Sequence, residues 1–183
     1  EATIEGYTTK VNGYNITNSH TPEQTSVSVI KEWEDEDNQD GVRPESITVV
    51  LLANGKENQT QVISAENQWK HTWTGLAKYE SGSEIKYSVE EVTVQGYESA
   101  IEETAENTFT ITNTYEPETV TISGSKTWED EENQDGKRPA SITVNLLANG
   151  EKVQSKTVTE ADNWAWSFKN LPKNKNGQEI VYT

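Results

Sequence analysis

The stretch SITVVLLANG, residues 46–55, decides the fold class of this chain. Ile47, Val49 and Leu51 recur at every second position, which is the period of a β-strand that buries one face. The stretch ends in Ala-Asn-Gly (53–55), and an Asn-Gly pair after an alternating segment is typical of a tight hairpin turn. It therefore predicts a half-buried strand that turns back on itself.

The chain also contains an internal repeat. Residues 26–88 align with 121–183 without a gap, at an offset of 95 residues (121 minus 26), and nearly half of the aligned pairs are identical. The segment 13–23, GYNITNSHTPE, resembles TFTITNTYEPE at 108–118 at the same offset. We therefore expect three parts: the C-terminal remnant of a preceding repeat (1–20), one complete repeat (24–116) and the N-terminal two-thirds of the next (119–183).

Two short linkers, TPEQT (21–25) and EPET (116–119), separate these parts. Each linker contains a proline, which stiffens the backbone, so semi-rigid connections between repeats are expected. The chain begins within a repeat and contains no Met, so we expect it to be a piece of a longer protein.

Alternating segments recur throughout each repeat. Val27 and Val29 share a face with Lys31, and Phe109 and Ile111 share a face with Asn113. About seven such segments per repeat, separated by turn signals such as SGS and without a convincing amphipathic helix, predict an all-β fold of tandem antiparallel β-sandwiches.

Composition excludes several classes of function. The chain carries 31 acidic and 15 basic residues, for a formal charge of −16, which disfavours nucleic-acid binding and anionic membrane surfaces. No apolar run is long enough for membrane insertion. The absence of Cys rules out disulfides, thiolate metal sites and thiol nucleophiles within this sequence.

The acidic loop WEDEDNQDGVRP (33–44) recurs as WEDEENQDGKRP (128–139) and is a candidate calcium site. If Gly41 is the invariant glycine of an EF-hand loop, the twelfth position is Ile47, where a bidentate Glu belongs. The second copy fails in the same way. We therefore interpret the loop as a turn in which Arg43 pairs with nearby carboxylates, and we predict no metal; a calcium site of another kind stays open.

Three strands each place one polar residue where the alternation points inward: Lys31, Glu91 and Asn113. Either each side chain sits at a strand end and reaches solvent, or the three form one buried site. In the second case, a neutral lysine amine could attack the Asn carbonyl carbon while a Glu shuttles protons, with loss of ammonia and no cofactor. The neighbouring Glu90 faces outward by parity, which favours Glu91.

The segments KEWEDEDNQDGVRPESITVVLLANG (31–55), YSVEE (87–91), GYE (96–98) and TITNTY (110–115) resemble the Cna B-type repeats of Gram-positive collagen adhesins. The resemblance implies a prealbumin-like Greek-key sandwich in an extracellular, cell-wall-anchored surface protein or pilin. It also implies an intramolecular isopeptide bond between a Lys on the first strand and an Asn on the last, promoted by a Glu. These roles map onto Lys31, Asn113 and Glu91.

The cut repeats carry partial sites. Glu1 and Asn18 match the Glu and Asn of the complete repeat, and Lys126 matches its Lys. The two ends of one chain could complement those of another by strand addition, rebuilding a split domain in trans. Alternatively, the boundaries are arbitrary.

Two classes of function remain. The resemblance, the repetition and the stiff linkers favour structural stalk repeats, which have neighbouring repeats as partners and catalyse only a single-turnover self-cross-linking. The alternative is an adhesion module that binds a host extracellular protein, for example through an aromatic patch of its Trp residues. No residue set supports a turnover enzyme.

Overall fold

The computed structural model describes residues 1–183, of which 58% lie in β-strands and 5% in helices, and they group into two compact units. Residues 1–33 with 44–113 form one unit, and residues 34–43 with 114–183 form the other. The first eleven strands are β1 (Thr8–Asn12), β2 (Asn15–Ser19), β3 (Gln24–Glu34), β4 (Ser46–Ala53), β5 (Lys56–Ser64), β6 (Lys70–Ala77), β7 (Tyr79–Glu80), β8 (Ser83–Glu84), β9 (Tyr87–Glu91), β10 (Glu98–Ala105) and β11 (Thr108–Thr114).

The remaining elements belong to the second unit or are short helical turns. The strands are β12 (Thr119–Ser125), β13 (Ser141–Ala148), β14 (Glu151–Thr159), β15 (Ala165–Pro172), β16 (Asn174–Lys175) and β17 (Gln178–Glu179). The helices are three-residue 3-10 turns, η1 (Ala65–Asn67), η2 (Glu131–Asn133) and η3 (Glu160–Asp162). None has the length and apolar character needed to cross a membrane.

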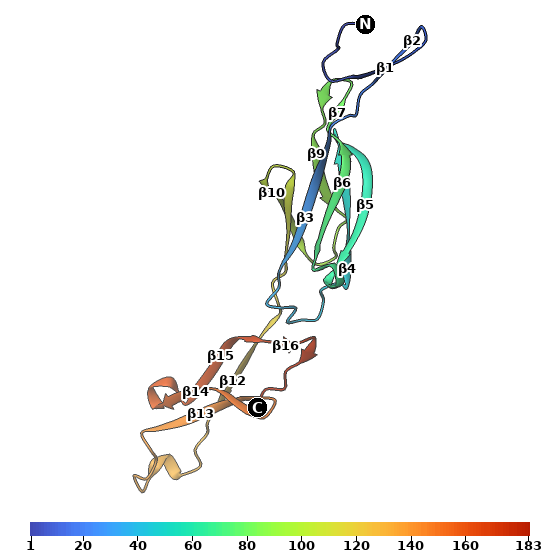
Figure 1. Ribbon diagram of the computed structural model, residues 1–183. Coiled ribbons are helices and arrows are strands. Elements are labelled where there is room, and N and C mark those ends of the chain that lie inside the picture. The colour runs from blue at the N-terminus through green and yellow to red at the C-terminus, as the bar shows by residue number, and fades with distance from the viewer. The chain divides into compact units, whose positions relative to one another are not determined.

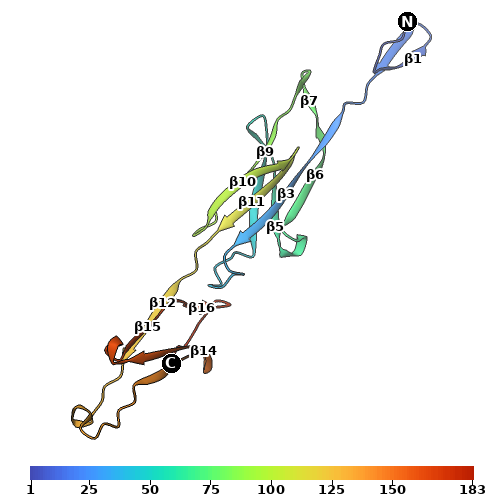
Figure 2. The ribbon, with the colours of Figure 1, turned by 90° about the vertical axis from the view of Figure 1, so that its left-hand side faces the viewer.

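The complete repeat is a sandwich of two sheets, with strand orders β10-β11-β3-β6 and β5-β4-β9 (Figures 1 and 2). Its seven longer strands and the small β7–β8 hairpin agree with the number predicted from the alternation. The inward positions of both sheets form one core, as predicted: Val27, Val29, Ile47, Val49, Leu51, Ile63, Trp73, Leu76, Tyr87, Val89, Phe109 and Ile111.

The first and last strands of the repeat, β3 and β11, are hydrogen-bonded neighbours that run in the same direction (Figure 2). Near their starts, the amide of Ser28 donates to the carbonyl of Asn107, and near their ends the amide of Tyr115 donates to that of Glu34. This pair departs from the antiparallel pairing expected of the sandwich, because the chain crosses to the other sheet before it returns beside β3. Lys31 and Asn113 thus lie on adjacent strands.

The predicted Asn-Gly hairpin joins β4 to β5. Asn54 and Gly55 have φ values of 51° and 75°, the left-handed conformations that a two-residue turn of this kind requires. The Asn54 side chain also accepts a hydrogen bond from the amide of Lys86 at 3.0 Å, so the turn is tied to the start of β9. The SGS turn between β7 and β8 has the same left-handed pair at Ser81 and Gly82.

The second unit has a smaller core around Leu146, Phe168 and Leu171, between the pairs β12–β15 and β13–β14. One substitution between the repeats is compensated across the strands. Gly124 pairs with Trp166, and a Cβ on Gly124 would lie 2.8 Å from the indole ring. The corresponding cross-strand pair in the complete repeat is Val29 with His71. A large residue on one strand is therefore matched by a small one on its neighbour, as close packing requires.

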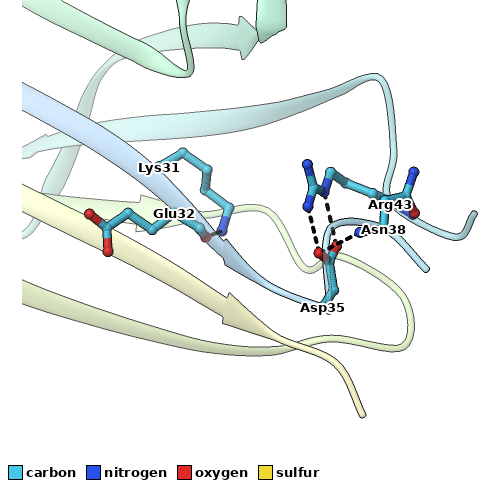
Figure 3. Close-up of polar contacts among 5 residues, drawn as sticks. All are labelled: Lys31, Glu32, Asp35, Asn38 and Arg43. Atoms are coloured by element: carbon cyan, nitrogen blue, oxygen red, sulfur yellow. Dashed lines mark hydrogen bonds and ion pairs between the residues drawn. The ribbon is translucent and has the colours of Figure 1, made fainter. Parts of the chain in front are cut away.

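An Asp–Arg pair organises each acidic loop, as expected from the sequence (Figure 3). Arg43 Nε donates to Asp35 Oδ2 at 2.9 Å, and the amide of Asn38 donates to Asp35 Oδ1 at 2.9 Å. In the second loop, Arg138 and Asp130 make the same contacts. The loops are therefore turns built around one ion pair, whose carboxylate oxygens are occupied by protein donors.

Replacing Asp35 by alanine tests how much this pair stabilises the fold. The Asp35 side chain is 1% exposed, whereas that of Asp130 is 30% exposed. Removing one partner of a buried pair is strongly destabilising, so Asp35→Ala should lower the free energy of unfolding by about 3 kcal/mol. Asp130→Ala should lower it by clearly less, because solvent screens an exposed pair. Urea denaturation of the two variants checks this, and equal losses would contradict the burial argument.

Candidate functional site

Lys31 lies on β3 with its side chain inside the sandwich, and the residue is 4% exposed. Its Nζ donates to the carbonyl oxygen of Glu32 at 2.7 Å (Figure 3). It also donates to the carbonyl oxygen of Ile111, on the adjacent strand β11, at 3.4 Å. The amine also lies 4.0 Å from the centre of the Trp33 ring, a cation–π distance. Backbone oxygens and an aromatic face thus surround the amine in place of water.

Asn113 and Glu91 complete the group. Asn113, on β11, is fully buried, and the side chain of Glu91, at the end of β9 in the opposite sheet, is 2% exposed. Asn113 Nδ2 donates to Glu91 Oε1 at 3.1 Å, and Lys31 Nζ lies 3.9 Å from the same oxygen. All three residues point inward and lie together, so the alternative in which they reach solvent at strand ends does not hold.

The sheet register explains why Glu91, and not its neighbour, enters the interior. β9 pairs antiparallel with β4, with Glu91 opposite the buried Val49 and Glu90 opposite Val50. Cross-strand partners share a face of the sheet, so Glu91 lies on the core face with Val49. Glu90 is exposed on the other face. The parity argument from the sequence therefore places the carboxylate correctly.

Two buried oxygens of the site have no hydrogen-bond donor: Glu91 Oε2 and Asn113 Oδ1. A buried acceptor without a donor costs free energy, so these two oxygens destabilise the site in its present form.

An aromatic cluster covers the amine, and the sequence argument did not predict it. Trp33 packs edge-on against Trp69 at 5.2 Å and against Tyr97 at 5.0 Å between ring centres. Trp128 and Trp164 repeat the first contact at 5.1 Å in the second unit. The Trp pairs recur at the same spacing in both copies of the repeat, and this recurrence was the sequence signal that could have predicted the cluster. Tyr97 also has a counterpart, Tyr7, because EATIEGY (1–7) matches EVTVQGY (91–97), but its contact with Trp33 was not predicted.

The partial sites keep part of this geometry. Asn18 Nδ2 donates to Glu1 Oε1 at 3.0 Å, close to the 3.1 Å of the Asn113–Glu91 contact. Lys126 Nζ donates to the carbonyl of Thr127, as Lys31 does to Glu32, and lies 4.5 Å from the Trp128 ring. Lys126 is exposed, because no strand equivalent to β11 covers it. Residues 1–20 thus hold the Glu and the Asn of a site, and residues 119–183 hold only the Lys.

The other candidates are accounted for by local contacts. His71 packs edge-on against Trp73 at 4.8 Å, and burial holds the pKa of His71 below its ordinary value. His20 Nδ1 donates to the carbonyl of Gly6 at 2.8 Å. No cluster of three or more His, Cys, Asp or Glu side chains is arranged to hold a metal ion.

Comparison with known proteins places the chain in one family. The Cna protein B-type domain matches residues 27–114 and 122–183. A collagen adhesin of Staphylococcus aureus is 48% identical over 182 residues, which is 98% of this chain and 15% of the adhesin.

Solved structures agree. The crystal structure of two B repeat units (B1B2) of the collagen-binding protein of S. aureus matches with a TM-score of 0.85 and 47% identity, over 99% of this chain and 49% of that one. A single B repeat unit (B1) of the same surface protein matches with 40% identity and a TM-score of 0.48, over 88% of this chain and 84% of that one. This chain therefore spans about half of the two-repeat structure and a small part of the adhesin. It belongs to the Cna B-type domain family, a family of structural repeats and not of enzymes.

Proposed function

We propose that the complete repeat forms an intramolecular amide between Lys31 and Asn113, promoted by Glu91, and that it serves as a load-bearing stalk module. The observation that carries this proposal is the buried group itself. Lys31 Nζ and Asn113 Nδ2 lie 3.9 Å and 3.1 Å from the same atom, Glu91 Oε1, inside a core that is otherwise apolar. Ionisable groups are rarely buried in this way without a function.

The proposed reaction needs only these three side chains. The neutral amine of Lys31 attacks Cγ of Asn113; the Nζ–Cγ bond forms, the Cγ–Nδ2 bond breaks and Nδ2 leaves as ammonia. Glu91 Oε1 accepts a hydrogen bond from Nδ2 at 3.1 Å and lies 3.9 Å from Nζ, so Glu91 can carry one proton from Nζ to Nδ2 as the amine approaches. Burial fixes the partners in place and supplies the high effective concentration that makes such an amide exchange feasible.

The amide of Asn113 can also be activated by Glu91. Exchanging the nitrogen and oxygen of this amide by rotation brings Oδ1 to the position 3.1 Å from Glu91 Oε1. A protonated Glu91 would then donate to Oδ1 and polarise the carbonyl carbon towards attack. This arrangement would also supply a donor to Asn113 Oδ1, which has none in the present one.

The position of the bond gives it a mechanical role. β3 and β11 are the first and last strands of the repeat and lie side by side, so a covalent link between them lets tension pass from one linker to the next without loading the rest of the sandwich. In the chain-entropy treatment of cross-links, closing the loop from 31 to 113 stabilises the fold by about 4.5 kcal/mol. An amide does not undergo thiol exchange, so the staple is insensitive to redox conditions.

We further propose a setting for this module: a cell-wall-anchored adhesin on the surface of a Gram-positive bacterium. The collagen adhesin and the two-repeat structure of S. aureus support it, because this chain matches each over nearly all of its own length. The partners of the repeat would then be the neighbouring repeats of the parent protein. The stalk would hold a separate binding region away from the wall.

Intact mass of the denatured chain tests the cross-link. We expect the wild-type chain to be lighter than its sequence mass by one ammonia. Glu91→Gln keeps the shape of the side chain but cannot relay a proton, so that variant should keep its full mass. Glu90→Gln, at the exposed neighbouring position, should lose ammonia like the wild type. A wild-type chain of full mass would refute the proposal.

The energetic role of the bond is tested with Lys31→Met, whose unbranched side chain is one atom shorter and cannot react. We expect its free energy of unfolding to fall by up to about 4.5 kcal/mol relative to wild type, as measured by urea denaturation. Lys126→Met removes the corresponding exposed lysine of the second unit and should change the value by less than about 0.5 kcal/mol. Equal stability of Lys31→Met and wild type would show that residue 31 carries no stabilising cross-link.

The partial sites support a second proposal, that two chains can join covalently end to end. Glu1 and Asn18 already hold the geometry of the complete site, and Lys126 presents an exposed amine beside its own Trp. If the N-terminal segment of one chain adds to the open edge of the second unit of another, Lys126 Nζ can attack Cγ of Asn18 with loss of ammonia. Repeated addition would give a head-to-tail series.

Denaturing electrophoresis of the concentrated chain tests this joining. We expect a ladder of oligomers that survives denaturation, and its loss in Lys126→Arg and in Asn18→Ala. Lys31→Arg should leave the ladder unchanged, because that lysine belongs to the intramolecular site. A single monomer band from the wild type at high concentration would contradict the proposal without affecting the Lys31–Asn113 bond.

A further inference from the structure

The acidic loop 34–43 lies in the same compact unit as residues 114–183, and the side chain of Asp40 makes three hydrogen bonds to that segment. Asp40 Oδ2 accepts hydrogen bonds from Tyr115 Oη at 2.9 Å and from the amide of Glu118 at 2.8 Å. Its Oδ1 accepts from Asn174 Nδ2 at 3.2 Å. Burial raises the pKa of Asp40, but these hydrogen bonds outweigh burial and hold its pKa below the ordinary value.

The backbone of the loop makes a second contact, with the β16–β17 hairpin. The amide of Gly177 donates to the carbonyl of Gln39 at 3.0 Å. Gly41 lies so close that a Cβ built on it would be 2.6 Å from the Cα of Gly177. No side chain fits in this space. Glycine is therefore needed at position 41 for two reasons: the positive φ of the turn, and the close approach of the loop backbone to the hairpin backbone.

The second loop, 130–138, has the same internal structure. Arg138 binds Asp130 as Arg43 binds Asp35, and the amide of Gly136 donates to the carbonyl of Asn133 at 2.9 Å, as Gly41 does to Asn38. Yet a Cβ built on Gly136 would have nothing within 4 Å. The shape of the loop is therefore preformed and does not depend on a docked segment.

We propose that the acidic loop of a B-type repeat is a docking site for the linker and first short hairpin of the B-type repeat that follows it. In loop 34–43, Asp40 and Gly41 hold residues 115–118 and the β16–β17 hairpin. Asp135 and Gly136 present the same site in loop 130–138. Its occupant is a further B-type repeat. This inference stands on the fold alone and is independent of the cross-link.

The occupant is recognised through two features that every repeat of this chain supplies. One is the backbone amide that follows the linker proline, at Glu118 and, in the earlier linker, at Glu23. The other is a hairpin glycine, Gly177 or Gly82, each with positive φ. The side-chain donors are not shared between the repeats: where this joint has Tyr115 and Asn174, the preceding copy has His20 and Tyr79.

Hydrogen exchange of the intact chain tests the docking, because the two loops provide matched controls. In Asp40→Ala and Gly41→Ala, the amides of Glu118 and Gly177 should exchange on the order of tenfold faster than in wild type. Asp135→Ala and Gly136→Ala should leave both amides unchanged. Gly41 and Gly136 both have positive φ, 71° and 66°, so alanine strains both loops and the difference isolates the docked contact.

Two results would overturn the proposal. One is equal acceleration at Glu118 and Gly177 in the variants of both loops, which would mean that the effect is general destabilisation. The other is exchange of both amides in the wild type at the rate of an unprotected peptide, which would mean that the loop holds nothing in solution.

Discussion

The structure of the repeat depends on how a lysine amine is accommodated inside a β-sandwich. A buried amine without partners is prohibitively costly, and around Lys31 the fold supplies two backbone oxygens, a Trp face and a carboxyl oxygen. Each of these partners depends on the topology. The amine reaches the carbonyl oxygen of Ile111 only because β11 lies beside β3. It lies near Glu91 only because β9, in the opposite sheet, ends level with Lys31.

The two copies of the sequence show how much of this comes from tertiary context. Lys31 and Lys126 have the same local neighbours, and each amine contacts the next carbonyl and the Trp two residues on. One lysine is buried and the other exposed, because only the first is covered by a last strand. Local sequence therefore sets the direction of the side chain, and the distant strand sets its environment.

Much of the fold and of the candidate site could be predicted from the sequence for this reason. Period-two alternation placed Lys31, Glu91 and Asn113 on inward faces, because strand parity is a local property. The parallel pairing of β3 with β11 was not predicted, since alternation says nothing about which strands become neighbours. The contact of Tyr97 with Trp33 joins residues far apart in sequence. The contacts of Asp40 were also not predicted, because its hydrogen-bond donors are residues 115, 118 and 174, which lie far from it in sequence.

The acidic loop and the cross-link act at different strengths, and this difference bears on how a stalk responds to force. On the proposals above, tension within a repeat passes through a covalent bond between β3 and β11 that no physiological pull on the fold would open. The loop holds the segment that follows it with single hydrogen bonds, each contributing about 1 kcal/mol net. Under load, the loop contacts of Asp40 and Gln39 would therefore release before the sandwich does. They would form again when the load falls, because the Asp35–Arg43 pair keeps the loop in shape without its occupant. A stalk built in this way yields first at its loops while its domains stay folded.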